Sequence, residues 1–181
     1  LDTYIALLGV LKAGAAFVPL DPSVPSDRVT FIAQDASLRD LVTTSTFREK
    51  TSTLPCPVLE LDQEVEALSL QHETRPQVCV DPASLCYIIY TLGTTSRPKG
   101  VAFSHASIVQ FLRVATPIYG VRHNDRVYQG MSIAFDFSLE EIWPTWIAGA
   151  TLVAGPTDSQ HLGHELTEFL VKHKITVLCC V

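Results

Sequence analysis

The sequence contains the stretch Tyr90-Thr91-Leu92-Gly93-Thr94-Thr95-Ser96-Arg97-Pro98-Lys99-Gly100-Val101, in which hydroxyl residues and a glycine lead to a Lys-Gly pair. An apolar run at residues 86–90 precedes it and predicts a buried strand. A strand that leads into a Gly/Thr/Ser/Lys loop is suited to hold phosphate, because backbone N–H groups and hydroxyls surround an anion there and a lysine adds positive charge. By composition alone, the stretch is equally compatible with an ordinary polar loop.

The spacing excludes the two commonest nucleotide-binding loops. The P-loop of nucleotide triphosphatases needs a second glycine where Pro98 stands, and a hydroxyl residue where Gly100 follows Lys99. The dinucleotide fingerprint G-x-G-x-x-G is also absent.

The order of residues resembles the phosphate-binding signature of the adenylate-forming superfamily, which contains acyl-CoA synthetases, luciferases and the adenylation domains of nonribosomal peptide synthetases. The usual form there is Tyr-Thr-Ser-Gly-Ser/Thr-Thr-Gly-x-Pro-Lys-Gly-Val, and this chain departs from it at Leu92 and Ser96. Residues 11–22, Leu-Lys-Ala-Gly-Ala-Ala-Phe-Val-Pro-Leu-Asp-Pro, are similar to a core motif of the peptide-synthetase adenylation domains, which we interpret as structural.

The resemblance implies that the loop binds the phosphates of ATP together with Mg²⁺. The residues it assigns to this role are Thr91, Gly93, Thr94, Thr95, Ser96, Lys99 and Gly100. The superfamily commonly has a Ser/Thr-His pair near the nucleotide, so His105 after Ser104 is added to the set. Without the resemblance, a histidine in a first helical turn is more often a surface or capping residue. The family's catalytic lysine lies beyond residue 181, so no catalytic residue is assigned, and no metal ligand.

A second candidate site spans residues 135–142. Ser138 and Glu141 have the Ser-x-x-Glu spacing of a capping box, which predicts the start of a helix. Asp136 stands between two phenylalanines, and a carboxylate in apolar surroundings needs a cationic partner or several hydrogen bonds. It could therefore cap the helix or bind the ammonium group of a ligand.

The order Phe-Asp-x-Ser resembles the adenylation-domain motif in which the aspartate holds the α-amino group of the substrate. Acyl-CoA synthetases for fatty acids do not normally keep that aspartate. The resemblance implies that Asp136 binds an α-amino acid and that Phe137 and Glu140 line its side-chain pocket. A glutamate in that pocket would favour a basic or polar amino acid.

The whole chain has 181 residues, 47% of them hydrophobic, which is enough for the core of about one domain. The net charge is −6 and no basic block occurs, which argues against nucleic acid and anionic membranes as partners. No apolar run reaches the roughly 18 residues of a membrane span. The five cysteines are odd in number and lack metal-like spacing, so we expect reduced thiols and a cytoplasmic protein.

Hydrophobic periodicity predicts alternating helices and strands. Helices are expected at 1–13, 27–36, 105–116, after Ser138 and at 161–173, and strands at 40–44, 58–61, 86–90, 101–103, 127–131, 151–154 and 175–180. The fold class is therefore α/β, with mixed, largely parallel sheets and packed helices. By the resemblance it is part of the large N-terminal domain of an adenylate-forming enzyme. We interpret residues 1–181 as a partial AMP-binding domain truncated at both ends, because a buried strand at 175–180 is a poor C-terminus.

The predicted function is that of an ATP-dependent ligase acting as part of a longer chain. It would convert a carboxylate, expected to be an α-amino acid, to an acyl adenylate with release of pyrophosphate, for thioester transfer to the phosphopantetheine of a carrier-protein domain in the parent chain. Residues 1–181 alone are expected to be inactive. Two alternatives stay open, an acyl-CoA synthetase-type ligase and a catalytically degenerate binding or scaffold module. The second arises because Ser96 at a positive φ would cost roughly 1–2 kcal/mol, and Leu92 replaces a hydroxyl.

Overall fold

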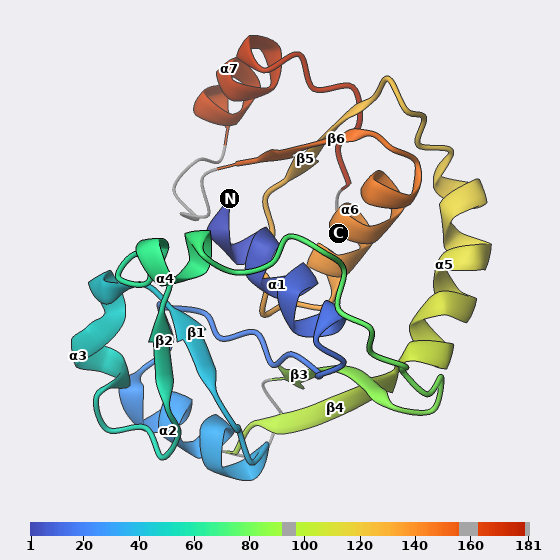
Figure 1. Cartoon of the computed structure of the whole chain (residues 1–181). Coiled ribbons are helices and arrows are strands. Elements are labelled where there is room, and N and C mark those ends of the chain that lie inside the picture. Colours follow the sequence, from blue (N-terminus) through green and yellow to red (C-terminus); the bar gives the residue numbers. More distant parts are fainter. Residues whose placement is uncertain (92–96, 156–162, 180–181) are drawn as a thin grey trace. The chain divides into compact units, whose positions relative to one another are not determined.

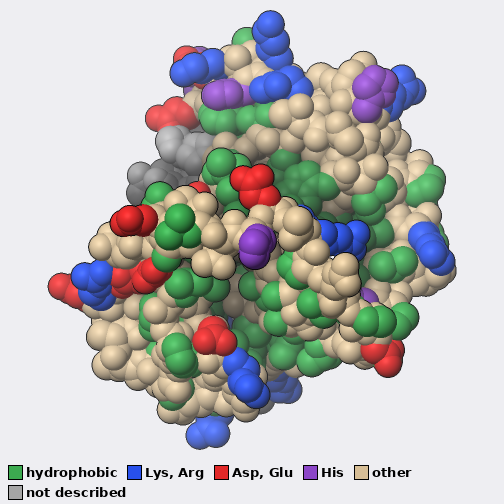
Figure 2. Space-filling model, in the orientation of Figure 1, with side chains coloured by type: hydrophobic (Ala, Val, Ile, Leu, Met, Phe, Trp, Pro, Cys, Tyr) green, Lys and Arg blue, Asp and Glu red, His purple; other side chains and the backbone are tan. Residues whose placement is uncertain are grey.

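The computed structural model describes residues 1–91, 97–155 and 163–179 (Figure 1). The chain divides into two units, Leu1–His105 and Ala106–Val181, and each is described by itself. Within the described ranges, no helix is long and apolar enough to cross a membrane. On the face shown in Figure 2, acidic and basic side chains are interspersed, in keeping with the absence of a basic block in the sequence.

The first unit contains an antiparallel pair, β3 (Leu85–Thr91) and β4 (Lys99–Ser104). Phe17 adds a parallel bridge to β3: its N–H donates to the carbonyl of Cys86 at 3.2 Å, and its carbonyl accepts from the N–H of Ile88 at 3.0 Å. The ring of Tyr87 stacks on Phe17 and on Phe103, with centroids 5.5 and 4.8 Å apart. This aromatic stack joins three separate stretches of chain in the core of the first unit.

Two longer helices belong to this unit, α1 (Asp2–Lys12) and α2 (Ser26–Asp35). Gly14, with φ of +76°, lies just past α1, in the left-handed conformation that commonly ends a helix. Helix α2 buries three apolar side chains, Val29, Ile32 and Ala33. Its first residue is Ser26, one position before the predicted start, and Pro25 precedes the helix.

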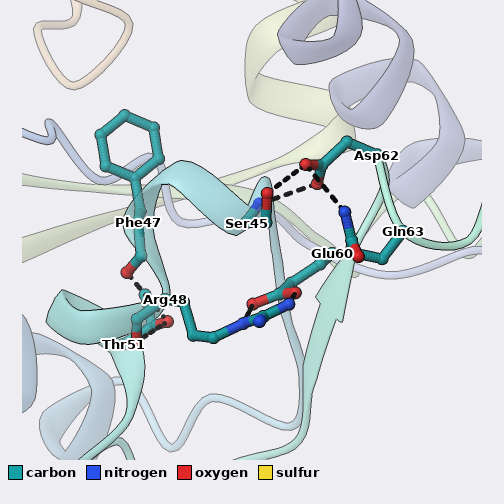
Figure 3. A network of polar contacts seen from close by, with 7 residues as sticks. All are labelled: Ser45, Phe47, Arg48, Thr51, Glu60, Asp62 and Gln63. Atoms are coloured by element: carbon teal, nitrogen blue, oxygen red, sulfur yellow. Dashed lines mark hydrogen bonds and ion pairs between the residues drawn. The ribbon is translucent and has the colours of Figure 1, made fainter.

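A small parallel pair, β1 (Leu41–Thr43) and β2 (Val58–Glu60), completes the strands described in this unit. Three short elements that we did not expect lie between or after these strands: a 3-10 turn at Ser45–Phe47, α3 (Arg48–Thr51) and α4 (Val65–Ser69). Two carboxylates hold the turn in place (Figure 3). Glu60 forms an ion pair with Arg48, and Asp62 accepts from the backbone N–H of Ser45 at 2.7 Å and from its hydroxyl.

The second unit is built on the parallel pair β5 (Arg126–Gln129) and β6 (Thr151–Ala154). Helix α6 (Phe137–Ile147) contacts both strands and buries Leu139 and Ile142 against them. Val177 forms a parallel bridge with Val127, so the strand predicted at 175–180 is reduced to a single bridge among the described residues. Helices α5 (His105–Tyr119) and α7 (His164–Lys172) confirm the two remaining helix predictions.

These elements confirm a mixed α/β fold with two parallel strand pairs among the described residues. The pair β3–β4 is antiparallel. Strands β5 and β6 are joined through α6, and β1 and β2 through α3, as parallel strands require a crossover. Only residues 92–98 join β3 to β4. Such a connection is shorter than the dozen or so residues of a parallel crossover, so these strands pair as a hairpin.

The ring of Tyr128 occupies the space between two glycines at the carboxyl ends of β5 and β6. A Cβ at Gly130 would lie 2.2 Å from Tyr128 Cε1, and one at Gly155 would lie 2.3 Å from Tyr128 Cε2. Burial of Tyr128 raises the pKa of its hydroxyl, with a smaller contribution from the charge of Glu141. No side chain fits at either glycine while the tyrosine keeps this position.

We therefore expect Gly155→Ala to destabilise the second unit. The added methyl group overlaps a buried ring, and overpacking of this kind costs about 1–3 kcal/mol. In a thermal melt of the full-length protein, that cost should lower the transition of this unit by several degrees, at about 2–4 °C per kcal/mol. Gly9→Ala is the control, because nothing lies within 4 Å of a Cβ in that helical position. Equal melting of both variants would contradict the packing argument.

Candidate functional site

The β3–β4 hairpin carries the described part of the predicted phosphate loop. Thr91 and Lys99 are paired across the hairpin, and the Thr91 hydroxyl donates to the Lys99 carbonyl at 3.5 Å. Both residues are exposed. The residues between them that were predicted to bind phosphate lie outside the described residues, as do both departures from the family signature. These residues are Leu92, Gly93, Thr94, Thr95 and Ser96. The hairpin thus brings the first and last polar residues of the signature together at the base of the loop.

Gly100 has a packing role in the hairpin. It faces Tyr90 in the strand register, and a Cβ there would lie 2.9 Å from Tyr90 Cζ and 3.0 Å from Ile88 Cγ2. The absence of a side chain lets the tyrosine ring lie over the paired strand. This packing role of Gly100 is observed, whereas its role in phosphate binding stays a prediction.

His105 begins α5, at the opposite end of β4 from Lys99. Six strand residues span roughly 20 Å, so the hairpin separates His105 from the base of the loop by about that length. Its backbone N–H donates to the carbonyl of Ser84 at 3.0 Å, and its Nε2 atom is buried without a hydrogen-bond partner among the described residues. The role of His105 at a nucleotide stays a prediction.

Asp136 precedes α6 and is exposed, so the expected apolar surroundings are wrong. The neighbouring Phe135 is itself 49% exposed. One carboxylate oxygen of Asp136, Oδ1, accepts from the backbone N–H of Phe137 at 2.9 Å. Of the two roles considered for this carboxylate, helix capping is the one that the structure contains, and an exposed carboxylate at a helix start remains open to a ligand.

Phe137 and Glu140 share the first turn of α6 with this aspartate. Asp136 and Glu140 are four residues apart and therefore lie on one face of the helix. The hydroxyl of Tyr119, at the end of α5, donates to Glu140 Oε2, and this hydrogen bond, together with burial, raises the pKa of Tyr119 to about 12. Sequence reasoning missed Tyr119, because a contact between residues 21 positions apart leaves no signal in the spacing.

The predicted capping box is wrong. Ser138 lies inside the first turn, and its hydroxyl donates to the carbonyl of Phe135 at 2.7 Å. Glu141 is 1% exposed and points to the end of β5, where it accepts from the side chain of Gln129 at 3.0 Å and from the backbone N–H of Met131 at 3.2 Å. Burial raises the pKa of Glu141. This carboxylate ties α6 to the segment that leads from β5 to Asp136.

Known proteins are similar to this chain in sequence and in fold. The family described as AMP-binding enzyme matches residues 1–181. The chain belongs to this family. That membership confirms the resemblance to the adenylate-forming superfamily.

The sequence relatives of this AMP-binding chain include long synthases. It is 38% identical over 181 residues to syringomycin synthase SyrB1 of Pseudomonas syringae pv. syringae, a match that covers 98% of this chain and 28% of that protein. It is 37% identical over 180 residues to the Delta-poly-L-ornithine synthetase of Acinetobacter baumannii, covering 97% and 13%. Against a linear gramicidin synthase of Brevibacillus parabrevis the identity is 33%, covering 98% and 2%. The chain thus spans less than a third of each of these relatives.

Solved structures share the fold. The nonribosomal peptide synthetase FmoA3, in its alpha-methyl-L-serine-AMP bound form, aligns with a TM-score of 0.84 at 26% identity, covering 96% of this AMP-binding chain and 19% of that one. The N-terminal subdomain of Klebsiella oxytoca NpsA aligns with a TM-score of 0.79 at 24% identity, covering 98% and 44%. The first of these confirms the predicted fold class, and the second agrees with it at the level of fold alone.

The raised pKa of Glu141 predicts a characteristic pH dependence of stability. A carboxyl whose folded pKa is above its unfolded value stabilises the protein below the unfolded pKa, and that stabilisation is lost as pH rises through the folded pKa. Glu141→Gln removes this titration. The melting temperature of the full-length variant, relative to wild type, should therefore increase as pH rises above the ordinary glutamate range and through the raised pKa of Glu141.

Asp125→Asn is the control of opposite sign. Hydrogen bonds from the Thr176 hydroxyl and from the backbone N–H of Arg122 lower the pKa of Asp125. Its stabilisation is present above the unfolded pKa and is lost as pH falls through the folded pKa. Parallel pH profiles for the two variants would contradict the assignment of Glu141 as a buried acid.

Proposed function

We propose that residues 1–181 are part of a larger adenylation domain, and that the whole protein uses ATP to activate an α-amino acid. In this reaction a carboxylate oxygen of the amino acid bonds to the α-phosphorus of ATP, the bond to the β-phosphate oxygen breaks, and pyrophosphate leaves. The observation that carries the proposal is the hairpin that pairs Thr91 with Lys99 at the base of a Gly/Thr/Ser loop, in a chain of the AMP-binding family.

The activation step brings two anions together, so the charge of the triphosphate must be spread over donors and cations. Lys99 supplies a positive charge at the base of the loop, and Thr91 supplies a hydroxyl. A magnesium ion accompanying ATP is part of the proposal. The described ranges of the chain contain no group of three or more His, Cys, Asp and Glu side chains that could hold a metal ion, and no residue is assigned to it.

The exposed carboxylate of Asp136 supports an amino acid as the acid that is activated. An ammonium group can approach it while Oδ1 keeps its helix-capping hydrogen bond. Glu140, on the same face of α6, would meet the substrate side chain, and its negative charge favours a basic or polar amino acid. The names of two similar proteins agree with this class, since one includes poly-L-ornithine and the other is bound to alpha-methyl-L-serine-AMP.

The acyl group would then pass to a carrier-protein domain. The carbonyl carbon bonds to the sulfur of a phosphopantetheine thiol, the bond to the AMP oxygen breaks, and the thiol proton is released. The similarity to the linear gramicidin synthase and to SyrB1 supports this second step and a carrier domain in the same protein.

ATP–pyrophosphate exchange by the full-length protein, surveyed across amino acids, tests the proposal. We expect exchange with a basic or polar amino acid, and Lys99→Ala should lower the rate by about 100-fold or more because a cation at the transferring phosphates is lost. Lys12→Ala, in an exposed position of α1, is the charge-matched control. Absence of exchange with any acid would favour a degenerate scaffold, and exchange with fatty acids alone would favour an acyl-CoA synthetase.

Asp136→Asn separates amino-acid binding from nucleotide binding. The KM for the amino acid should rise by about 10- to 100-fold while the KM for ATP stays unchanged, because only the ammonium partner has lost its charge. Asp27→Asn removes the same charge from the first turn of α2 and serves as its control. A preference for apolar amino acids in the survey would contradict the role given to Glu140.

A further inference from the structure

The hydroxyl of Tyr90 donates to Oδ2 of Asp35 at 2.6 Å, across 55 residues of sequence. Tyr90 is the residue before Thr91 at the end of β3, and Asp35 is the last residue of α2. Burial and then the hydrogen bond to Asp35 raise the pKa of Tyr90. The tyrosine therefore remains a protonated donor at neutral pH.

The same tyrosine ring covers the partner strand. Gly100 is its cross-strand neighbour, and a methyl group at Gly100 would lie only 2.9 Å from Tyr90 Cζ, so the ring lies directly over the glycine backbone. From the end of β3, one side chain thus contacts the end of α2 and the start of β4. The next residue outward on each strand is Thr91 or Lys99.

The position of Asp35 is unfavourable for the helix that carries it. A negative charge in the last turn opposes the helix dipole, and the last turn of α2 holds no basic residue. Propensity and dipole therefore give no reason for an aspartate here. The hydrogen bond to Tyr90 gives one.

A fixed hairpin end matters because the hairpin is narrow. Beyond the bridge with Phe17, the described end of the hairpin has two strands only, and such a pair is marginally stable. Each group that is ordered before a ligand arrives reduces the entropy lost on binding. Asp35 and Gly100 restrict Tyr90 from two directions, through its hydroxyl and through its ring. This restriction acts on the two strand ends from which the loop departs.

We propose that Asp35 is a positioning residue for triphosphate binding, which acts by holding Tyr90 and thereby fixing the ends of β3 and β4 that carry Thr91 and Lys99. The proposal rests on the proposed function of the hairpin. Asp35 itself contacts no substrate in it, so its effect must pass through the tyrosine.

The test is the kinetics of ATP–pyrophosphate exchange in the full-length protein with Asp35→Ala, Asp35→Asn and Tyr90→Phe. Asp35→Ala and Tyr90→Phe should each raise the KM for ATP by about five- to tenfold and leave the KM for the amino acid within about twofold. Asp35→Asn keeps an acceptor and should lie between wild type and Asp35→Ala. Because both residues act through one hydrogen bond, the double variant Asp35→Ala/Tyr90→Phe should be no worse than either single variant.

Asp62→Ala is the matched control for a merely structural effect. It removes the two hydrogen bonds from Ser45 in the same unit, at a turn that does not belong to the hairpin (Figure 3). It should lower the melting temperature as Asp35→Ala does, and it should leave both KM values unchanged.

Three results would overturn the proposal. They are an unchanged KM for ATP in Asp35→Ala and Tyr90→Phe, an equal rise of both KM values, and additive effects in the double variant. All three results can be measured only if the wild-type protein is active. They are therefore distinct from the result that would overturn the proposed function. A wild type that gives no exchange with any carboxylate overturns the proposed function, and this assignment with it.

Discussion

The shortness of the connection between β3 and β4 is the constraint on which the first unit depends. Seven residues, 92–98, cannot hold a crossover helix, so the strands form a hairpin and place Thr91 opposite Lys99. The aromatic stack through Tyr87 packs against the hairpin, and the glycine at position 100 leaves room for the ring of Tyr90 over the paired strand. In a family of α/β folds with parallel sheets, this local reversal is what brings a hydroxyl and a lysine to the same point.

In the second unit, neighbouring carboxylates on α6 have different environments. Successive helical residues point about 100° apart, so Glu140 reaches Tyr119 at the end of α5 while Glu141 turns inward to the end of β5. Burial suits Glu141 to hold the backbone in place, because its oxygens meet N–H donors that would otherwise be unsatisfied. Glu140 is only half-buried, so another molecule can reach its carboxylate.

Periodicity in the sequence predicted most helices and strands, because buried faces repeat at regular intervals. It missed α3 and α4, which are too short to show a repeat. The Ser-x-x-Glu spacing wrongly indicated a capping box at Ser138 and Glu141, because Asp136 already caps the helix and leaves both residues inside it. Polar contacts between distant residues, such as Tyr90 with Asp35, leave no local pattern and needed the structure. The loop residues from Gly93 to Ser96 lie outside the described ranges, so their assignment rests on the family signature alone.

The position of the Tyr128 ring between two glycines bears on which residues of the second unit can be substituted. Both parallel strands end against one ring, at Gly130 and Gly155, and the bonds that hold the next segment go to its backbone, at the Met131 N–H and the Phe135 carbonyl. Bonds to backbone groups do not depend on which side chains the segment carries. Substitutions at residues 131–135 would therefore change the side chains beside Asp136 while β5, β6 and Tyr128 keep their packing.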